Sequence, residues 1–276
     1  MRRGARRRPG AGAARLSHRL GGAGIRAVLP ECHGRSGPAV VCHLRSGSRA
    51  AAIAPIEAVL FDWGDTLFHP PDAGRVILDA ARKRGIAMDE AEARALWTEL
   101  WEAGKTPEEV ASGRDLSLEQ HRASWTRLFG RADSRVPGIS ARLYELMDPY
   151  RWTVYQDTRP TLETLRARGL RLGLVSNHAY DLRRVFAARG LSPFIDTYVL
   201  SFEKGVAKPS PRLFEIAAAD IGVAPERTLM VGDHPEADGA AARAAGMQTY
   251  ILPAWSGAGP RGLGHVVELV DRSRDK

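Results

Sequence analysis

Residues 56–66 read IEAVLFDWGDT, and this stretch decides the fold of the chain. The apolar run from Ile56 to Phe61 has the length of a short strand, and Asp62 follows it directly. A short apolar run that ends in a polar residue is typical of a parallel strand buried on both faces. In an open α/β sheet, ligands bind beyond the carboxyl ends of such strands. We therefore predict a buried strand that presents Asp62 to a functional site.

Similar apolar runs recur along the chain and alternate with helical patterns. The further strands are predicted at residues 170–175, 198–200, 228–231 and 249–252. The intervening helices are predicted at 161–168, 182–189, 211–221 and 236–245, and each stops at or near a glycine. This alternation predicts an α/β fold with a doubly wound parallel sheet.

Residues 72–152 interrupt the alternation. They contain helical patterns at 73–83, 89–101, 118–129 and 139–147, and no convincing strand. The stretch is too long for a crossover, so we interpret it as a helical domain inserted after the first strand. The predicted organisation is a basic tail at 1–54, a core at 55–71 and 153–276, and a helical cap at 72–152.

The positive charge of the chain is concentrated at its N-terminus. The formal charge is +8, yet residues 1–50 contain eleven arginines and a single acid, Glu31, so the remainder is nearly neutral. Residues 1–54 have few large apolar side chains, and we predict that they are disordered. Three interpretations of the tail stay open: a transit peptide, a basic arm for nucleic acid or anionic lipid, and an extension without a role from a misplaced start codon.

Cysteine content, hydropathy and charge limit the cellular location of the protein and the partners it is expected to bind. Cys32 and Cys42 lie in the tail, each before a histidine (His33 and His43), but their spacing matches no zinc finger. The body lacks cysteine and suits a reducing cytoplasm. No apolar run is long enough to cross a membrane. The near-neutral body offers no basic stripe, so nucleic acid is not an expected partner.

Polar side chains follow the predicted strands at the edge where ligands are expected. They are Asp62 after the first strand, Ser176 and Asn177 after the second, Lys208 in the loop after the third, and Asp233 and Asp238 after the fourth. Three carboxylates near one lysine would repel one another unless a divalent cation lay among them. Oxygen ligands suit Mg²⁺, and with the metal bound the site could accept a phosphate dianion.

Four motifs in this order resemble those of the haloacid dehalogenase-like (HAD) hydrolase superfamily. They are residues 59–67 (VLFDWGDTL), 175–177 (VSN), 208–209 (KP) and 231–238 (VGDHPEAD). The resemblance covers about residues 56–253. It implies a Rossmann-like core, with an all-helical cap after the first motif, in the phosphatase-like branch.

The resemblance implies an Mg²⁺-dependent hydrolase of small phosphorylated metabolites. Asp62 would attack phosphorus and form an aspartyl-phosphate that water then hydrolyses, and Lys208 would offset the developing charge. The substrate-binding residues would be Thr66, Ser176, Asn177 and Lys208, and the metal ligands would be Asp62, Asp233, Asp238 and the backbone carbonyl of Gly64.

One position departs from the family pattern. Phosphatases of this family carry a second Asp two residues after the nucleophile, which protonates the leaving group and activates water. Here that position is Gly64, and the carboxylate lies one place later, at Asp65. In an extended segment a shift by one residue turns a side chain to the opposite side. Without an acid/base the rate typically falls by about 10²- to 10⁴-fold. His178 and His234 adjoin catalytic motifs and are weaker candidates for this role.

Two alternative functions stay open. Phosphonate-cleaving relatives carry a small residue at this position and use a cap lysine as a Schiff base, for which Lys105 is the candidate. A catalytically weakened relative would bind a phosphorylated ligand or a protein partner without turnover. Haloacid dehalogenases need no metal, so the acidic motif at 231–238 argues against that activity.

The cap is expected to select the substrate. Candidates to line the cleft are Trp97, Trp101, His121, Trp125, Tyr144 and Trp152. At helical spacing, such side chains more often belong to a core.

Overall fold

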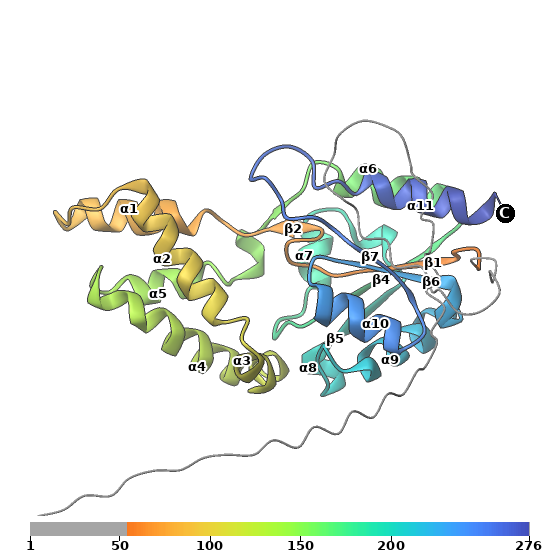
Figure 1. The fold of residues 1–276 in the computed structure, drawn as a ribbon, viewed down its shortest axis with the longest axis horizontal. Coiled ribbons are helices and arrows are strands. Elements are labelled where there is room, and N and C mark those ends of the chain that lie inside the picture. Colours follow the sequence, from red (N-terminus) through yellow and green to blue (C-terminus); the bar gives the residue numbers. More distant parts are fainter. Residues whose placement is uncertain (1–53, 276) are drawn as a thin grey trace, which may run out of the picture. The chain divides into compact units, whose positions relative to one another are not determined.

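A five-stranded parallel sheet forms the centre of the computed structural model, which describes residues 54–275 (Figure 1). Strand β1 (Ala58–Phe61) lies in the middle, between β4 (Arg171–Ser176) and β6 (Thr228–Gly232). β5 (Thr197–Leu200) and β7 (Gln248–Ile251) form the two edges. The strand order β5-β4-β1-β6-β7 confirms the predicted doubly wound parallel sheet, with the first strand at its centre.

Alternate side chains of β1 pack on opposite faces of the sheet. Val59 and Phe61 belong to one hydrophobic cluster, and Ala58 and Leu60 belong to another. All four residues are completely buried, as a strand covered on both faces requires. The helices on the Val59 face are α6 (Thr158–Ala167), α7 (Arg183–Ala188) and α11 (Gly264–Arg274), and those on the Leu60 face are α9 (Pro211–Ile221) and α10 (Ala241–Ala244) (Figure 1).

The segment between β2 (Phe68–His69) and β3 (Thr153–Val154) is helical. These two short strands pair antiparallel where the chain leaves the core and returns to it. The helices between them are α1 (Ala73–Lys83), α2 (Glu90–Ala103), α3 (Pro107–Ala111), α4 (Leu118–Phe129) and α5 (Ile139–Glu145). Helices α1, α2, α4 and α5 share a separate hydrophobic cluster that includes Leu100 and Phe129, whereas α3 buries none of its residues. The predicted cap limits, 72 and 152, stay predictions.

Several elements differ from the sequence prediction. The helix predicted at 236–245 is a wide π-helical turn, η6 (Pro235–Ala240), followed by the single turn of α10. Helices α3 and α11 were not predicted, because α3 is only five residues long and α11 follows a glycine-rich loop. A further single turn, α8 (Ser201–Lys204), follows β5 directly. The short 3₁₀ turns are η1 (Arg114–Leu116), η2 (Gly130–Ser134), η3 (Pro149–Arg151), η4 (Ser192–Phe194) and η5 (Pro225–Arg227).

The predictions for the N-terminal tail lie outside the described residues. These include the disorder of residues 1–54, apart from Ala54, and the Cys-His pairs at 32–33 and 42–43. Within residues 54–275, none of the helices combines the length and the hydropathy that a membrane-spanning helix needs.

Candidate active site

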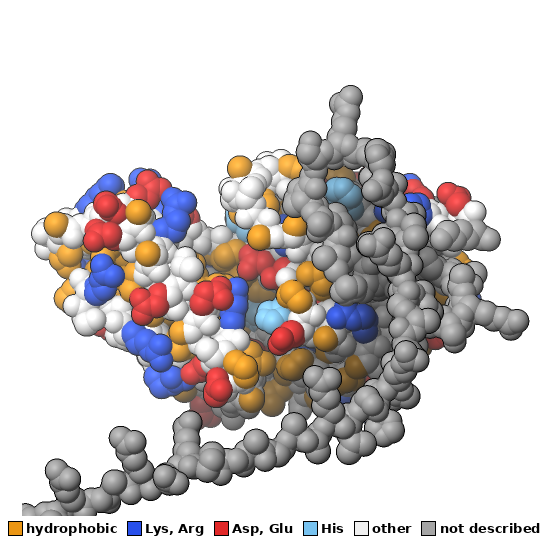
Figure 2. Space-filling model, in the orientation of Figure 1, with side chains coloured by type: hydrophobic (Ala, Val, Ile, Leu, Met, Phe, Trp, Pro, Cys, Tyr) orange, Lys and Arg blue, Asp and Glu red, His pale blue; other side chains and the backbone are white. Residues whose placement is uncertain are grey.

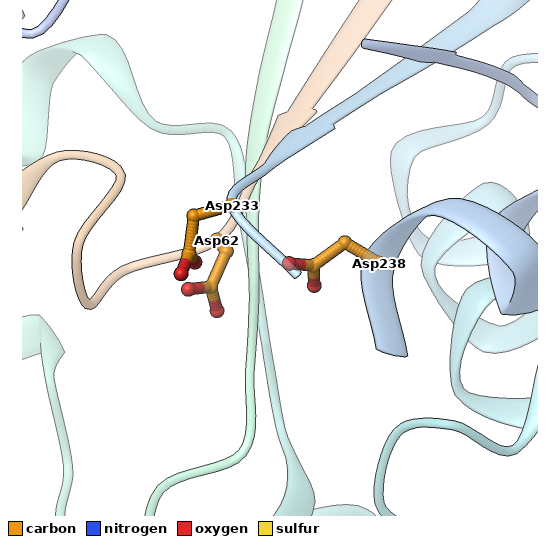
Figure 3. A group of neighbouring side chains, drawn as sticks. All are labelled: Asp62, Asp233 and Asp238. Atoms are coloured by element: carbon orange, nitrogen blue, oxygen red, sulfur yellow. The ribbon is translucent and has the colours of Figure 1, made fainter. Parts of the chain in front are cut away.

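Three carboxylates meet beyond the carboxyl ends of β1 and β6 (Figure 3). Asp62 follows β1 and donates its backbone N–H to the carbonyl of Val231 in β6 (2.9 Å), which fixes the start of its loop. Asp233 follows β6, and Asp238 reaches in from η6. One oxygen from each carboxylate lies within 4.8 Å of the others. Neighbouring parallel strands therefore bring together groups that are about 170 residues apart in the sequence.

The position of Asp238 depends on Gly232 and on the wide turn. A Cβ atom at position 232 would lie 2.2 Å from Oδ2 of Asp238, so only glycine permits this approach. The backbone N–H of His234 donates to the same oxygen (3.0 Å). In η6 the N–H of Gly239 reaches back five residues to the carbonyl of His234. Such π-turns are frequent at functional sites, and this one aims Asp238 at the sheet edge.

Lys208 joins the carboxylates. Its Nζ donates to Oδ1 of Asp62 (2.6 Å) and to Oδ1 of Asp238 (2.7 Å), and its side chain is 5% exposed. Asn177 holds the backbone of Lys208 on both sides of the residue. Its Nδ2 donates to the Lys208 carbonyl (2.8 Å), and its Oδ1 accepts the Lys208 N–H (2.7 Å). Both ends of the Asn177 amide are therefore engaged in holding the lysine loop.

Burial dominates the electrostatics of this cluster. It raises the pKa of Asp62 to about 6, with Lys208 opposing the shift and Asp238 adding to it. It raises the pKa of Asp233 to about 8, and repulsion from Asp62 and Asp238 adds to the effect. Burial alone would lower the pKa of Lys208, but Asp238 and Asp62 outweigh it and raise that pKa. A single lysine leaves the three carboxylates with excess negative charge, which a divalent cation would offset.

A cavity of about 550 Å³ opens over the cluster and is lined by residues of the core and of the helical segment. Charged side chains of both signs and a histidine gather near the middle of Figure 2. The predicted site residues that line the cavity are Asp62, Gly64, Ser176, Asn177, Lys208 and Asp233. Thr66 and Asp238 are not in its lining. Thr66 is fully buried, and within residues 54–275 its hydroxyl has no hydrogen-bond partner.

Comparison with known proteins gives the same assignment as the motifs. Residues 56–246 match the haloacid dehalogenase-like hydrolase family. The chain belongs to this family. It is 32% identical to a phosphoserine phosphatase of Thermus thermophilus over 70% of this chain and 87% of that one. It is 34% identical to a glyceraldehyde 3-phosphate phosphatase of Methanopyrus kandleri, over 71% of this chain and 84% of that one. The L-2-haloacid dehalogenase of Xanthobacter autotrophicus shares the fold, with a TM-score of 0.52 and 22% sequence identity. The match covers 73% of this chain and 79% of that one.

A tryptophan ring packs tightly against the position that departs from the HAD pattern. A Cβ atom at Gly64 would lie 3.3 Å from the indole of Trp152. That indole packs on Trp63, with 4.4 Å between the ring centroids, and is 3% exposed, so it has little freedom to withdraw. Asp65 lines the same cavity and adopts φ of 53°, the only positive φ of a non-glycine residue in the described chain. Aspartate tolerates this left-handed conformation better than most residues.

The two histidines beside the motifs, His178 and His234, form hydrogen bonds with nearby backbone N–H groups. Nδ1 of His178 accepts the N–H of Tyr180 (3.1 Å), and Nδ1 of His234 accepts the N–H of Ala237 (3.1 Å). Burial lowers the pKa of His178 to about 3 and that of the nearby cap residue His121 to about 4. His178 is therefore neutral near pH 7. The expectation that both motif histidines are weaker candidates for the acid/base stays a prediction.

The helical segment contributes residues that the sequence reasoning missed. Arg114 and Asp115, in the turn η1, line the cavity. Of the cap candidates, Trp101, His121, Trp125 and Trp152 also line it, whereas Trp97 and Tyr144 do not. No local pattern distinguishes Arg114-Asp115 from the many other charged pairs in the sequence. Only the proximity of η1 to α8 places these residues near the site.

Proposed function

We propose that this hydrolase is an Mg²⁺-dependent phosphatase of small phosphorylated metabolites. The observation that carries the proposal is the contact of Lys208 with Asp62 and Asp238, next to a cavity that Asp62, Lys208 and Asp233 line. A nucleophilic carboxylate, a cation site and a buried lysine are the groups that phosphoryl transfer to an aspartate requires.

The donor set fits Mg²⁺. Oxygens of Asp62, Asp233 and Asp238 lie within 4.8 Å of one another, and carboxylate oxygens are the ligands this ion prefers. We propose these three residues and the carbonyl of Gly64 as the groups that hold it. The bound ion would supply positive charge that shields the carboxylates from the phosphate dianion and stabilises the transition state.

Asp62 acts as the nucleophile in the proposed reaction. One of its carboxylate oxygens forms a bond to phosphorus while the ester P–O bond breaks, and the alcohol leaves after taking up a proton. Water then attacks the aspartyl-phosphate, which releases inorganic phosphate and regenerates Asp62. Lys208 and Ser176 would bind the phosphoryl oxygens. Thr66, with its unpartnered buried hydroxyl, is proposed for the same cradle, although it does not line the cavity.

Asn177 takes a different role in this proposal from the one that the resemblance implies. Both polar atoms of its amide bind the backbone of Lys208. We therefore propose that Asn177 is a positioning residue, which holds Lys208 within reach of Asp62, and that it does not bind the phosphate directly.

Sequence relatives support phosphate monoesters as the substrate class, since two are phosphatases of phosphoserine and glyceraldehyde 3-phosphate. The phosphonate alternative retains one favourable observation, because Lys105 lines the cavity. Its Nζ is in an ion pair with Glu102 (2.9 Å), however, whereas a Schiff-base lysine needs a free amine. We further propose a cytoplasmic location and no membrane or nucleic-acid partner, because residues 54–276 contain no cysteine and are nearly neutral.

The test is a panel of phosphate monoesters and acyl phosphates, assayed with Mg²⁺ and with EDTA. We expect turnover that EDTA abolishes and Mg²⁺ restores, and loss of turnover in Asp62→Asn. Asp220→Asn, which removes a surface carboxylate paired with Lys204, is the matched control and should retain activity. Absence of EDTA-sensitive turnover across the panel would favour the non-catalytic alternative. Borohydride trapping of a substrate imine on Lys105 would favour the phosphonate alternative.

A further inference from the structure

Two adjacent charged residues of η1, Arg114 and Asp115, lie out of water in the cavity wall. Their side chains are 9% and 13% exposed. Arginine and aspartate are almost never this deeply buried unless they are paired. The only ion pair between them is a contact of 3.4 Å from Nε of Arg114 to Oδ2 of Asp115. This geometry is poor for a buried pair, so their attraction repays little of the free energy lost on removing both charges from water.

Arg114 is held firmly in place. Its Nη1 donates to the carbonyl of Gly104, and its guanidinium lies 4.7 Å from the ring centroid of Trp125. Trp125 in turn stacks on Trp101 and Phe129, with centroid distances of 5.4 Å and 5.1 Å. Within residues 54–275, Nη2 of Arg114 has no hydrogen-bond partner. A fixed guanidinium with an unused N–H edge is well suited to bind a carboxylate.

Asp115 is fixed through its backbone. The hydroxyl of Ser201 donates to the Asp115 carbonyl (2.6 Å), and the N–H of His178 donates to that hydroxyl (3.1 Å). The turn is thereby attached to the end of β5, close enough for Lys208 to influence the Asp115 carboxyl. Burial raises the pKa of that carboxyl, with Arg114 opposing the shift. Apart from the long contact to Arg114, the side chain has no partner in the described residues. It therefore retains acceptor capacity for a donor group of a ligand.

The rest of the cap wall is mainly apolar. Besides Trp101 and Trp125 it includes Val110, Leu116 and Met147. Among apolar side chains, charged contacts are stronger than in water, and an unmatched charge is costly. A ligand with complementary charges would therefore gain most of its selectivity from Arg114 and Asp115.

We propose that Arg114 and Asp115 select a leaving group of amino-acid type, in which Arg114 binds the carboxylate and Asp115 binds the ammonium group. This inference rests on the proposed phosphatase function, and it assigns the substrate as a phosphate monoester of a zwitterionic alcohol. Lys105, the other cation of the cap wall, is already paired with Glu102 and is 39% exposed.

Four substrates of similar size separate the two contacts. O-Phospho-L-serine carries both charges, O-phosphoethanolamine only the ammonium, the phosphate ester of 3-hydroxypropanoate only the carboxylate, and ethyl phosphate neither. Each charged contact should raise kcat/KM over ethyl phosphate by about 10- to 100-fold. Phosphoserine should therefore be turned over best, and the two substrates with one charge should be intermediate.

Variants show which residue makes each contact. For each variant, the ratio of kcat/KM for two substrates is compared with the same ratio for the wild-type enzyme. In Asp115→Asn, the preference for phosphoserine over the phosphate ester of 3-hydroxypropanoate should fall by about 10-fold or more. In Arg114→Lys, which keeps the positive charge and loses the planar guanidinium, the preference for phosphoserine over phosphoethanolamine should fall. Arg94→Gln, which removes an exposed cap arginine paired with Glu90, should leave both ratios unchanged.

Failure of this inference is distinguishable from failure of the proposed function. EDTA-sensitive turnover of p-nitrophenyl phosphate with no preference of phosphoserine over ethyl phosphate would overturn the inference alone. If no ester is turned over, the inference is tested by calorimetric measurement of ligand binding to Asp62→Asn. Tighter binding of phosphoserine than of ethyl phosphate supports the roles of Arg114 and Asp115, and equal binding of the two overturns them. Ratios unchanged in both variants would likewise exclude Arg114 and Asp115.

Discussion

Replacement of Asn177 by alanine tests whether catalysis depends on the backbone clamp of Lys208. Asn177 is the only asparagine in the sequence, and its amide makes hydrogen bonds of 2.8 Å and 2.7 Å to the carbonyl and N–H of Lys208. Each neutral hydrogen bond contributes about 0.5–1.5 kcal/mol, so the variant should lose about 1–3 kcal/mol of unfolding free energy. The lysine loop should then sample positions in which Nζ no longer reaches Asp62.

The same free energy limits the effect on the rate. If the loop must return to its present position for reaction, about 1–3 kcal/mol corresponds to roughly 5- to 150-fold lower kcat/KM. The assay is steady-state turnover of the best ester from the panel, with urea unfolding measured in parallel. A partial loss of this size would distinguish Asn177 from Asp62, whose replacement should abolish turnover.

Gln248→Ala is the matched control. Nε2 of Gln248 donates to the carbonyls of Ala54 (3.0 Å) and Glu226 (2.9 Å), so this variant also loses two hydrogen bonds between a side-chain amide and the backbone. Gln248 does not line the cavity. It should lose similar stability and keep the wild-type kcat/KM. If Asn177→Ala loses stability but retains the wild-type rate, the clamp has no catalytic role and our reasoning is wrong.

Three further predictions concern the loop at Gly64, the buried histidines and the metal. Gly64→Ala should cost about 1–3 kcal/mol, because its Cβ would lie 3.3 Å from the packed ring of Trp152, whereas Gly130→Ala, with open space around it, should be neutral in urea unfolding. Equal stability of the two variants would contradict the account of Trp152. Burial holds the pKa of His178 at about 3 and that of His121 at about 4, so only the unfolded chain takes up protons on these residues as pH falls through 6.5. The contribution of each histidine to stability should therefore fall by about 2 kcal/mol between pH 7 and pH 5, while the raised pKa values of Asp62 and Asp233 act in the opposite direction over the same range. The test is the stability difference between wild type and His178→Gln measured at pH 7 and at pH 5; a difference that does not change with pH would show that His178 is protonated in the fold. Mg²⁺ should raise the Tm of the wild-type protein, and Asp233→Asn should lose most of that rise while Asp220→Asn retains it; equal rises in all three proteins would place the ion elsewhere.

Short-range patterns predicted the frame of the molecule. The run that ends at Asp62 forms β1 in the centre of the sheet, and the runs before Asn177 and Asp233 form its neighbours. These predictions hold because hydrophobic alternation and turn residues act within a few residues of the chain. The π-turn that carries Asp238 was predicted as an ordinary helix, since its widening depends on contacts with Gly232 and His234.

Residue roles were less predictable than residue positions. The motifs placed Asn177 and Lys208 at the predicted site, but they did not reveal the two hydrogen bonds between the Asn177 amide and the backbone of Lys208. The absence of a carboxylate at position 64 was evident in the sequence. The close packing of the Trp152 ring, 3.3 Å from where a Cβ atom of residue 64 would lie, was not evident, because the two residues are 88 positions apart.

The sequence alone determined the buried strand that precedes Asp62, the acidic motif at 231–238 and the Lys-Pro motif at Lys208. Each of these features depends only on residues that are adjacent in the chain. The tertiary structure alone decided which side chains face the cavity. Arg114 and Asp115 line the cavity because Ser201, 86 residues further along the chain, binds the Asp115 carbonyl. Such contacts arise from the packing of whole elements against one another, which no local pattern in the sequence specifies.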